Sequence, residues 1–317
     1  MTQAHLRAFG RYVPERVVTN GELASQLECD PAWIVQMSGI EERRWAAPSD
    51  TVAGLGVRAA QDCLVRAGIE ATNIGLLIVA SGSGERRFPG PASSIGTGLG
   101  IAGVPAIDLP MASAGSLVAL ALAADLCARY RNVLVVGSEI MSRAICLAPA
   151  CKDTAILFGD GAGACLVSAA TGFALIRDAV LASDGDFASS LRLDLNAPLS
   201  MDGRTVIMQA ARKIPRAIAE LLERNQVAPA AVGAFLMHQA NLNLITRVAH
   251  AIAVPEDRFF LNIHRYGNTS SASLLIAAAE WCEQHPSPPC GPLVFAAFGA
   301  GLHWGALLAT VQPPISR

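Results

Sequence analysis

The sequence has 317 residues, of which 52% are hydrophobic and 16% are charged, with a formal net charge of −2. A chain of this length and apolar content can bury a large core, either as one large domain or as two similar halves. The near-neutral charge argues against a nucleic-acid-binding protein. The longest apolar runs, such as 117–124, are too short to span a bilayer, and residues 1–5 do not begin a signal peptide. The sequence therefore predicts a cytoplasmic protein without membrane insertion.

The eight cysteines form no C-x-x-C pair, and most of them lie in apolar segments. This pattern is typical of small buried side chains. It predicts neither a metal site nor a disulfide framework.

Strands and helices alternate in the first part of the chain. Residues 5–20 predict a strand and a turn, followed by a helix at which Thr19 and Glu22 have the spacing of a capping box. Residues 41–44 carry four charged side chains in a row and indicate a loop. The other predicted elements of this part are a helix over about 52–67, strands over 74–80 and 132–137, and a loop over 81–91.

The stretch 106–126 predicts a buried strand, a tight turn and a buried helix, because an apolar run leads through Pro-Met-Ala-Ser-Ala-Gly into an Ala/Leu-rich segment. Ser113 lies at the turn. The unpaired N–H groups and the positive dipole end of the helix favour a nucleophile or an oxyanion there. Taken alone, Ser113 is better explained as an N-cap residue, since serine is preferred at that position.

The second half of the chain repeats the plan of the first. The corresponding segments are 68–83 with 226–241, 106–126 with 260–281, and 158–169 with 298–310. An internal duplication with alternating strands and helices predicts two α/β halves, 1–170 and 171–317, packed face to face. The segment 171–205 is less regular and is expected to connect them.

Ligands of α/β sheets collect at the carboxyl ends of the strands, so equivalent loops of the two halves should meet at one site. These loops carry Ser113, His238 and Asn268. Considered alone, His238 at a strand end is explained as a surface or core residue whose hydrogen bonds are satisfied within the protein. Asn268 considered alone is explained as a turn residue. Together they make up a nucleophile, a base and an orienting amide.

Across nearly its whole length the chain resembles the β-ketoacyl-acyl-carrier-protein synthase III branch of the thiolase superfamily. The motifs that carry the resemblance are GRYVPERVVTN (10–20), residues 33–40, Phe88-Pro89, residues 108–115, LFGDGAGA (157–164), HQANL (238–242), YGNTSSAS (266–273) and residues 298–306. The resemblance implies a thiolase-like five-layered αβαβα fold, a homodimer and an acyl-carrier-protein partner. It implies no permanently bound cofactor, and a Cys-His-Asn site that takes an acyl group from coenzyme A.

His238 and Asn268 match that site directly, whereas Ser113 stands at the Cys position. A hydroxyl has a higher pKa than a thiol, so Ser113 needs a base, for which His238 is available. An oxoester is also less electrophilic than a thioester, which favours acyl transfer or selective loading over rapid condensation. An engineered Cys-to-Ser trap is the competing explanation. The resemblance assigns the oxyanion hole to the backbone N–H groups of Ser113 and Ala300.

The resemblance also assigns substrate-binding positions to Trp33, Phe88, Lys152, Met201, Arg204 and Asn243. Three departures from the family pattern weaken the expectation of coenzyme A binding. In the family, Trp33 and an Arg four residues later clamp the adenine ring, and Met37 stands in place of that Arg. Lys152 replaces a second Arg, and Asn243 replaces a third, which faces the carrier protein. The acyl donor is therefore either acyl-coenzyme A or the phosphopantetheine arm of an acyl-carrier protein.

Three further positions have alternative interpretations. Phe88 resembles a residue that closes the acyl pocket across the dimer, or it packs in the core. Arg204 either contacts a phosphate group or is an ordinary solvated arginine. Ser116 stands where the family usually has an aromatic residue, which predicts extra room near the nucleophile.

Three functions follow from these patterns. The first is a synthase III-type acyltransferase or condensing enzyme that acts through an ester on Ser113. The second is a catalytically silent scaffolding subunit, against which the presence of His238 and Asn268 argues. The third is a thioesterase or esterase, which the absence of a G-x-S-x-G motif disfavours.

Overall fold

The computed structural model describes residues 3–288 and 291–312. A nine-stranded mixed sheet with strand order β11-β12-β13-β8-β1-β7-β6-β4-β5 forms its framework. Its strands are β1 (His5–Tyr12), β4 (Leu76–Ala80), β5 (Ala106–Leu109), β6 (Asn132–Ile140), β7 (Asp160–Ser168), β8 (Ala174–Ser183), β11 (Ala234–Met237), β12 (Gly291–Gly299) and β13 (His303–Val311). Two small sheets pair β2 (Arg16–Thr19) with β3 (Glu42–Trp45), and β9 (Leu191–Arg192) with β10 (Ser200–Met201). The helices are α1 (Asn20–Leu27), α2 (Pro31–Ser38), α3 (Val52–Ala67), α4 (Pro91–Gly98), α5 (Gly115–Tyr130), α6 (Lys152–Ala155), α7 (Gly203–Arg224), α8 (Leu242–Ala251), α9 (Ile263–Tyr266) and α10 (Ser273–Gln284).

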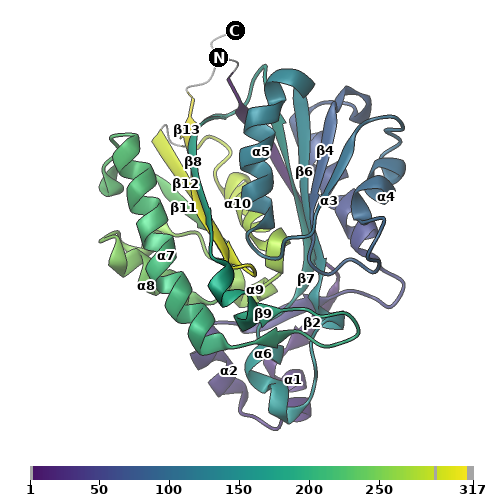
Figure 1. Ribbon diagram of the computed structural model, residues 1–317, viewed down its shortest axis with the longest axis vertical. Helices are drawn as coiled ribbons and strands as arrows, with labels where there is room; N and C mark the ends of the chain where they lie inside the picture. The colour runs from purple at the N-terminus through teal and green to yellow at the C-terminus, as the bar shows by residue number, and fades with distance from the viewer. Residues whose placement is uncertain (1–2, 289–290, 313–317) are drawn as a thin grey trace.

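The helices form the central layer and both outer layers around the sheet. Figure 1 shows α5 and α10 between the two halves of the sheet, with α3 and α4 on one outer side and α7 and α8 on the other. The buried apolar clusters follow the same layers. The largest cluster joins α5 and α10 to the inner faces of both halves, and two others lie beneath α3 with α4 and beneath α7 with α8. The predicted five-layered αβαβα arrangement is confirmed.

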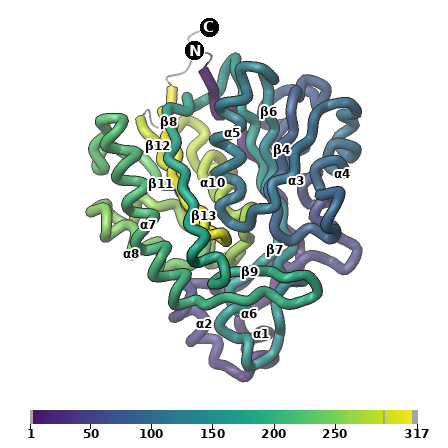
Figure 2. The backbone as a smooth tube through the Cα atoms, in the orientation of Figure 1, coloured from purple at the N-terminus to yellow at the C-terminus, as the bar shows by residue number. Residues whose placement is uncertain are grey.

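The strand order keeps β1, β7, β6, β4 and β5 on one side and β8, β13, β12 and β11 on the other (Figure 2). The two sides are joined where β1 pairs with β8 through His5–Leu175 and Leu6–Ala174. The division into domains at residue 170 stays a prediction. The expectation of an irregular connection over 171–205 is wrong in its first part, because β8 is a ten-residue strand in the middle of the sheet.

Several local predictions are confirmed. The hydroxyl of Thr19 accepts a hydrogen bond from the backbone N–H of Glu22 and so caps α1. The helix expected over about 52–67 is α3, with Thr51 as its N-cap residue.

Among the described residues, no helix is both long and apolar enough to cross a membrane.

Two predictions for the first half of the chain are wrong. Residues 41–44 belong largely to β3 rather than to a loop, and Arg43 is fully buried. Its guanidinium donates to Asn20 Oδ1 at 2.7 Å and to the carbonyl of Ile156 at 2.9 Å, so two of its nitrogens have acceptors inside the core. The strand 106–109 is exposed rather than buried, since β5 pairs only with β4 and forms an edge of the sheet.

The expected strand at the start of 260–281 is also absent. The parallel contact between Phe235 and Phe259 is an isolated bridge, and the chain continues into α9 and α10. Among the described residues, the second half of the sheet therefore has no counterpart of β5.

Candidate active site

Ser113 lies in the turn between β5 and α5. Its backbone φ is +60°, a left-handed conformation that residues other than glycine rarely adopt. The N-cap residue of α5 is Ala114, so the interpretation of Ser113 as a simple N-cap is wrong. A Cβ at Gly299 would lie 2.8 Å from Ser113 Cβ, which explains why glycine is needed at the end of β12. The turn thus holds Ser113 in a strained position against the other half of the molecule.

His238 directly follows β11 and is buried. Its backbone N–H donates to the carbonyl of Ala296 at 2.9 Å, which extends the pairing of β11 with β12 into the site. The ring Nδ1 is hydrogen-bonded to Ser273 Oγ at the start of α10, and this hydroxyl also accepts from the backbone N–H of Gln239 at 3.1 Å. Burial lowers the pKa of His238 from its ordinary 6.5 to about 3. The imidazole is therefore neutral at physiological pH.

Asn268 lies where loops from both halves meet. It forms a parallel bridge with Phe158, and its backbone N–H donates to the carbonyl of Leu157 at 2.8 Å. Gly267 has a φ of +65°, and a Cβ there would lie 2.9 Å from the same carbonyl. Asn268 Oδ1 accepts from the backbone N–H of Ser270 at 2.9 Å. This bond leaves the NH₂ group of the amide for a ligand.

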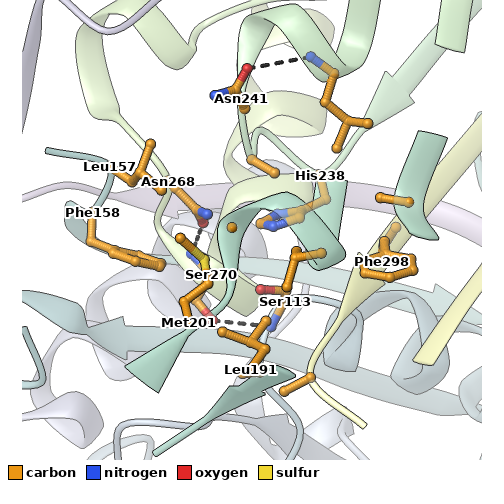
Figure 3. A pocket seen from close by; sticks show the side chains of 18 of the residues that line it. Ser113, Leu157, Phe158, Leu191, Met201, His238, Asn241, Asn268, Ser270 and Phe298 are labelled. Atoms are coloured by element: carbon orange, nitrogen blue, oxygen red, sulfur yellow. Dashed lines mark hydrogen bonds between the residues drawn. The ribbon is translucent and has the colours of Figure 1, made fainter. Parts of the chain in front are cut away.

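A single cavity brings the three side chains together. Ser113, His238 and Asn268 all line it and lie around the same end (Figure 3). Most of its other lining residues are apolar: Met141, Leu157, Phe158, Leu191, Leu193, Leu199, Met201, Val206, Ile207, Ile214, Met237, Leu244 and Phe298. Among the described residues that line it, Arg192 is the only charged one, and none is a carboxylate.

The backbone donors predicted for the oxyanion hole lie at this end of the cavity. Ala300 lines it directly. The N–H of Ser113 donates to Ser270 Oγ at 3.0 Å, so this donor is engaged within the protein (Figure 3). The oxyanion role of Ser113 and Ala300 stays a prediction.

Of the six predicted substrate-binding residues, Met201 lines the cavity. Trp33 and Lys152 form a pair, with the ammonium of Lys152 5.2 Å from the centroid of the Trp33 ring. Trp33 packs against the same apolar cluster as Leu157 and Leu199, which line the cavity. Neither Trp33 nor Lys152 lines the cavity itself.

The other three predicted residues lie farther out. Phe88 is 85% exposed on the loop before α4, so its interpretation as core packing is wrong. Arg204 is exposed in the first turn of α7. Asn243 joins α8 to α2, since its Nδ2 donates to the carbonyls of Gln36 and Met37 at 3.0 and 3.2 Å.

The extra room predicted at Ser116 is not there. Ser116 is fully buried and is hydrogen-bonded to the carbonyl of Ser271, and it does not line the cavity. A Cβ at Gly137 would come within 2.4 Å of its hydroxyl, so β6 fills the space that an aromatic ring would need.

Sequence reasoning named Asn268 in the segment 267–273 and missed the serines beside it. Ser270 contacts the Ser113 N–H, and Ser273 contacts the His238 ring. Ser271 donates to the buried carboxylate of Glu139 at 2.7 Å. The sequence feature that could have indicated these contacts is the run of hydroxyl side chains just before an apolar helix. Hydroxyl groups that are buried there need hydrogen-bond partners.

Comparisons with known proteins agree with this architecture. A family model for the C-terminal part of 3-oxoacyl-(acyl-carrier-protein) synthase III matches residues 222–311, and a second model for 3-oxoacyl-(acyl-carrier-protein) synthase III matches residues 107–185. The β-ketoacyl-(acyl-carrier-protein) synthase III of Oleidesulfovibrio alaskensis is 35% identical, over 97% of this chain and 98% of the relative. The chain belongs to the 3-oxoacyl-(acyl-carrier-protein) synthase III family.

Solved structures show the same thiolase-like fold. The 3-oxoacyl-(acyl-carrier-protein) synthase III of Aquifex aeolicus superposes with a TM-score of 0.93 at 32% identity, over 97% of this chain and 99% of that one. The priming β-ketosynthase of a polyketide biosynthetic pathway superposes with a TM-score of 0.91 at 31% identity, over 98% of this chain and 97% of that one. The resemblance to the synthase III branch is therefore confirmed, together with its fold.

Proposed function

We propose that this chain is a synthase III-type condensing enzyme. It loads an acyl group from a coenzyme A or carrier-protein thioester onto Ser113 and transfers it to a malonyl-type acceptor. The single observation that carries the proposal is the convergence of Ser113, His238 and Asn268 on one apolar cavity. The apolar wall of this cavity suits an acyl thioester.

The loading step follows from the position of Ser113, which stands where the family has a nucleophilic cysteine. Ser113 Oγ forms a bond to the thioester carbonyl carbon, the carbon–sulfur bond breaks, and the hydroxyl proton leaves with the thiol. The product is an oxoester, so no redox partner or metal enters the balance. His238 and Asn268 then stabilise the enolate that forms when a malonyl thioester loses carbon dioxide.

We also propose a homodimer. The edge strand β5 offers unpaired backbone groups and carries Ile107, which is 40% exposed. Phe88 is 85% exposed nearby in the sequence, as expected of a side chain that enters the partner's acyl pocket.

The buried free thiols of Cys63, Cys127 and Cys165 support a reducing compartment, so we place the enzyme in the cytoplasm.

Intact-mass spectrometry after incubation with acyl-coenzyme A or acyl-carrier protein tests this function. We expect a stable adduct of one acyl group per chain, and its loss in Ser113→Ala. The variant should fold normally, because the hydroxyl does not cap α5. Rapid release of free acid would instead identify a hydrolase. The absence of both adduct and product would identify a silent scaffold, and an adduct on Ser113→Ala would refute the assignment of the nucleophile.

A further inference from the structure

We propose that the buried carboxylate of Glu139 positions Ser113. The carboxylate anchors two segments, residues 81–83 and residues 270–271, which hold the turn that carries Ser113. Glu139 is then a positioning residue, because it does not line the cavity and acts on Ser113 through these segments. Its effect on loading rests on the proposed function, but its effect on the turn can be measured without any activity.

Glu139 lies one residue before the end of β6 and is fully buried. Among the described residues, its hydrogen-bond partners are backbone N–H groups and serine hydroxyls, and none of them carries a positive charge. A buried carboxylate without a countercharge is costly unless several donors surround it. The carboxylate and the segments that supply these donors therefore hold one another in place.

The first segment follows β4 and contacts the turn before Ser113. The backbone N–H groups of Gly82 and Ser83 donate to Oε2 of the carboxylate at 3.0 and 2.9 Å. The Ser83 hydroxyl accepts from the backbone N–H of Ile140 at 2.9 Å and donates its own proton to the same oxygen. A Cβ at Gly82 would lie 2.8 Å from Ala112 Cβ, so this segment packs directly against the residue that precedes Ser113.

The second segment comes from the other half of the chain. The backbone N–H of Ser271 donates to Oε1 of the carboxylate at 3.3 Å, and its hydroxyl donates to the same oxygen at 2.7 Å. The neighbouring Ser270 accepts from the backbone N–H of Ser113 at 3.0 Å (Figure 3). One carboxylate thus joins a contact on each side of the turn.

The turn needs such anchoring because of its backbone conformation. Ser113 has a φ of +60°, and a residue other than glycine keeps this conformation only when its surroundings hold it there. Loosening either segment should let the turn relax. Ser113 Oγ would then lose its alignment with the thioester carbonyl carbon, and a misplacement of about 1 Å can slow a reaction roughly 100-fold.

Glu139→Gln tests this role with little change of shape. Oε2 holds the first segment and Oε1 the second, so the amide nitrogen of glutamine replaces one acceptor with a donor and releases that segment. We expect the rate of adduct formation at saturating acyl-coenzyme A to fall roughly 10- to 100-fold. The donor concentration that gives half the maximal rate should stay within about threefold, because Glu139 does not line the cavity.

Hydrogen–deuterium exchange read by mass spectrometry tests the turn itself, whatever the enzyme catalyses. In Glu139→Gln, peptides that cover 109–116 should exchange faster than in the wild type. The matched control is Glu280→Gln, which changes a buried carboxylate that accepts from Asn262 and Arg265 at 2.9 and 2.6 Å and does not line the cavity. The control should leave exchange over 109–116 and the rate of adduct formation unchanged.

Two results would overturn the proposal. Exchange over 109–116 that is unchanged in Glu139→Gln, or that rises equally in Glu280→Gln, would show that Glu139 only stabilises the fold. Faster exchange there without slower adduct formation would refute its role in loading. If Glu139→Gln does not fold, Glu139→Asp decides the question, because its shorter side chain keeps the charge but cannot reach both segments, and the same two changes are expected.

The failure of the proposed function would look different. A wild-type enzyme that forms no adduct would refute the loading of Ser113. Faster exchange over 109–116 in Glu139→Gln alone would in that case still assign the anchoring of the turn to Glu139.

Discussion

Acid should destabilise this protein through His238, and the size of the effect can be worked from the site. The pKa of His238 is about 3 in the folded protein, because the neutral ring is buried, and it returns to about 6.5 in the unfolded chain. Between these values the unfolded state binds a proton and the folded state does not. Stability is therefore highest above pH 6.5 and falls as the pH is lowered towards 3.

The expected loss between pH 7.5 and pH 5 is about 2 kcal/mol from this residue alone. The figure depends almost entirely on the unfolded-state pKa, because the folded-state value lies well below pH 5. His5, whose pKa burial also lowers, contributes equally to every variant and cancels in a comparison.

Urea denaturation of the wild type and of His238→Asn, at both pH values and one protein concentration, measures the difference. Asparagine cannot take up a proton in this range, and its side chain can still accept from Ser273. The variant should lose about 2 kcal/mol less than the wild type on acidification. His250→Asn, which removes an exposed histidine on α8, is the control. Equal acid sensitivity of His238→Asn and the wild type would refute the buried neutral imidazole.

Three further changes have defined outcomes. Ser113→Cys should raise the rate of condensation with malonyl-carrier protein, followed by mass spectrometry of the product, since a thiol ionises and forms a more electrophilic ester; an unchanged or lower rate would contradict the assigned nucleophile. Phe88→Glu should weaken the proposed dimer in sedimentation experiments, because it would put a charge into the partner's apolar pocket, and a wild-type dimer affinity would count against this interface. Arg43→Met should lower the free energy of unfolding by about 3 kcal/mol or more, because Asn20 and the carbonyl of Ile156 lose a charged donor inside the core. A loss below about 1 kcal/mol in urea denaturation would show that these groups find other partners.

Individual helices were predictable because apolar periodicity is a local signal, whereas the five-layered arrangement was implied by the resemblance to the family. The stretch 52–67 has the spacing of an amphipathic helix and became α3 with the same bounds. The prediction of a buried strand over 106–109 was wrong. β5 lies at an edge of the sheet, and an apolar composition alone does not distinguish an edge strand from a central one.

The second wrong prediction came from interpreting a run of charged residues as a surface loop. Residues 41–44 have the composition of a surface loop, yet Arg43 is fully buried because Asn20, Val18 and Ile156 supply acceptors from distant parts of the chain. Such a partner set depends on tertiary structure, and no spacing rule predicts it. The positions of His238 and Asn268 were predicted from motifs, whereas the contact of Ser273 with the His238 ring joins residues that are 35 positions apart in the chain.

A serine at position 113 should make the proposed loading step slower than a cysteine would, because a hydroxyl is a weaker acid than a thiol. His238 and Asn268 line the cavity together with Ser113, and their proposed role in stabilising the enolate does not depend on the atom at position 113. In the proposed mechanism we therefore expect loading to be the slow half of the cycle. A thiol at the same position would ionise more readily beside the helix N-terminus, so Ser113→Cys should accelerate loading and leave the enolate step nearly unchanged.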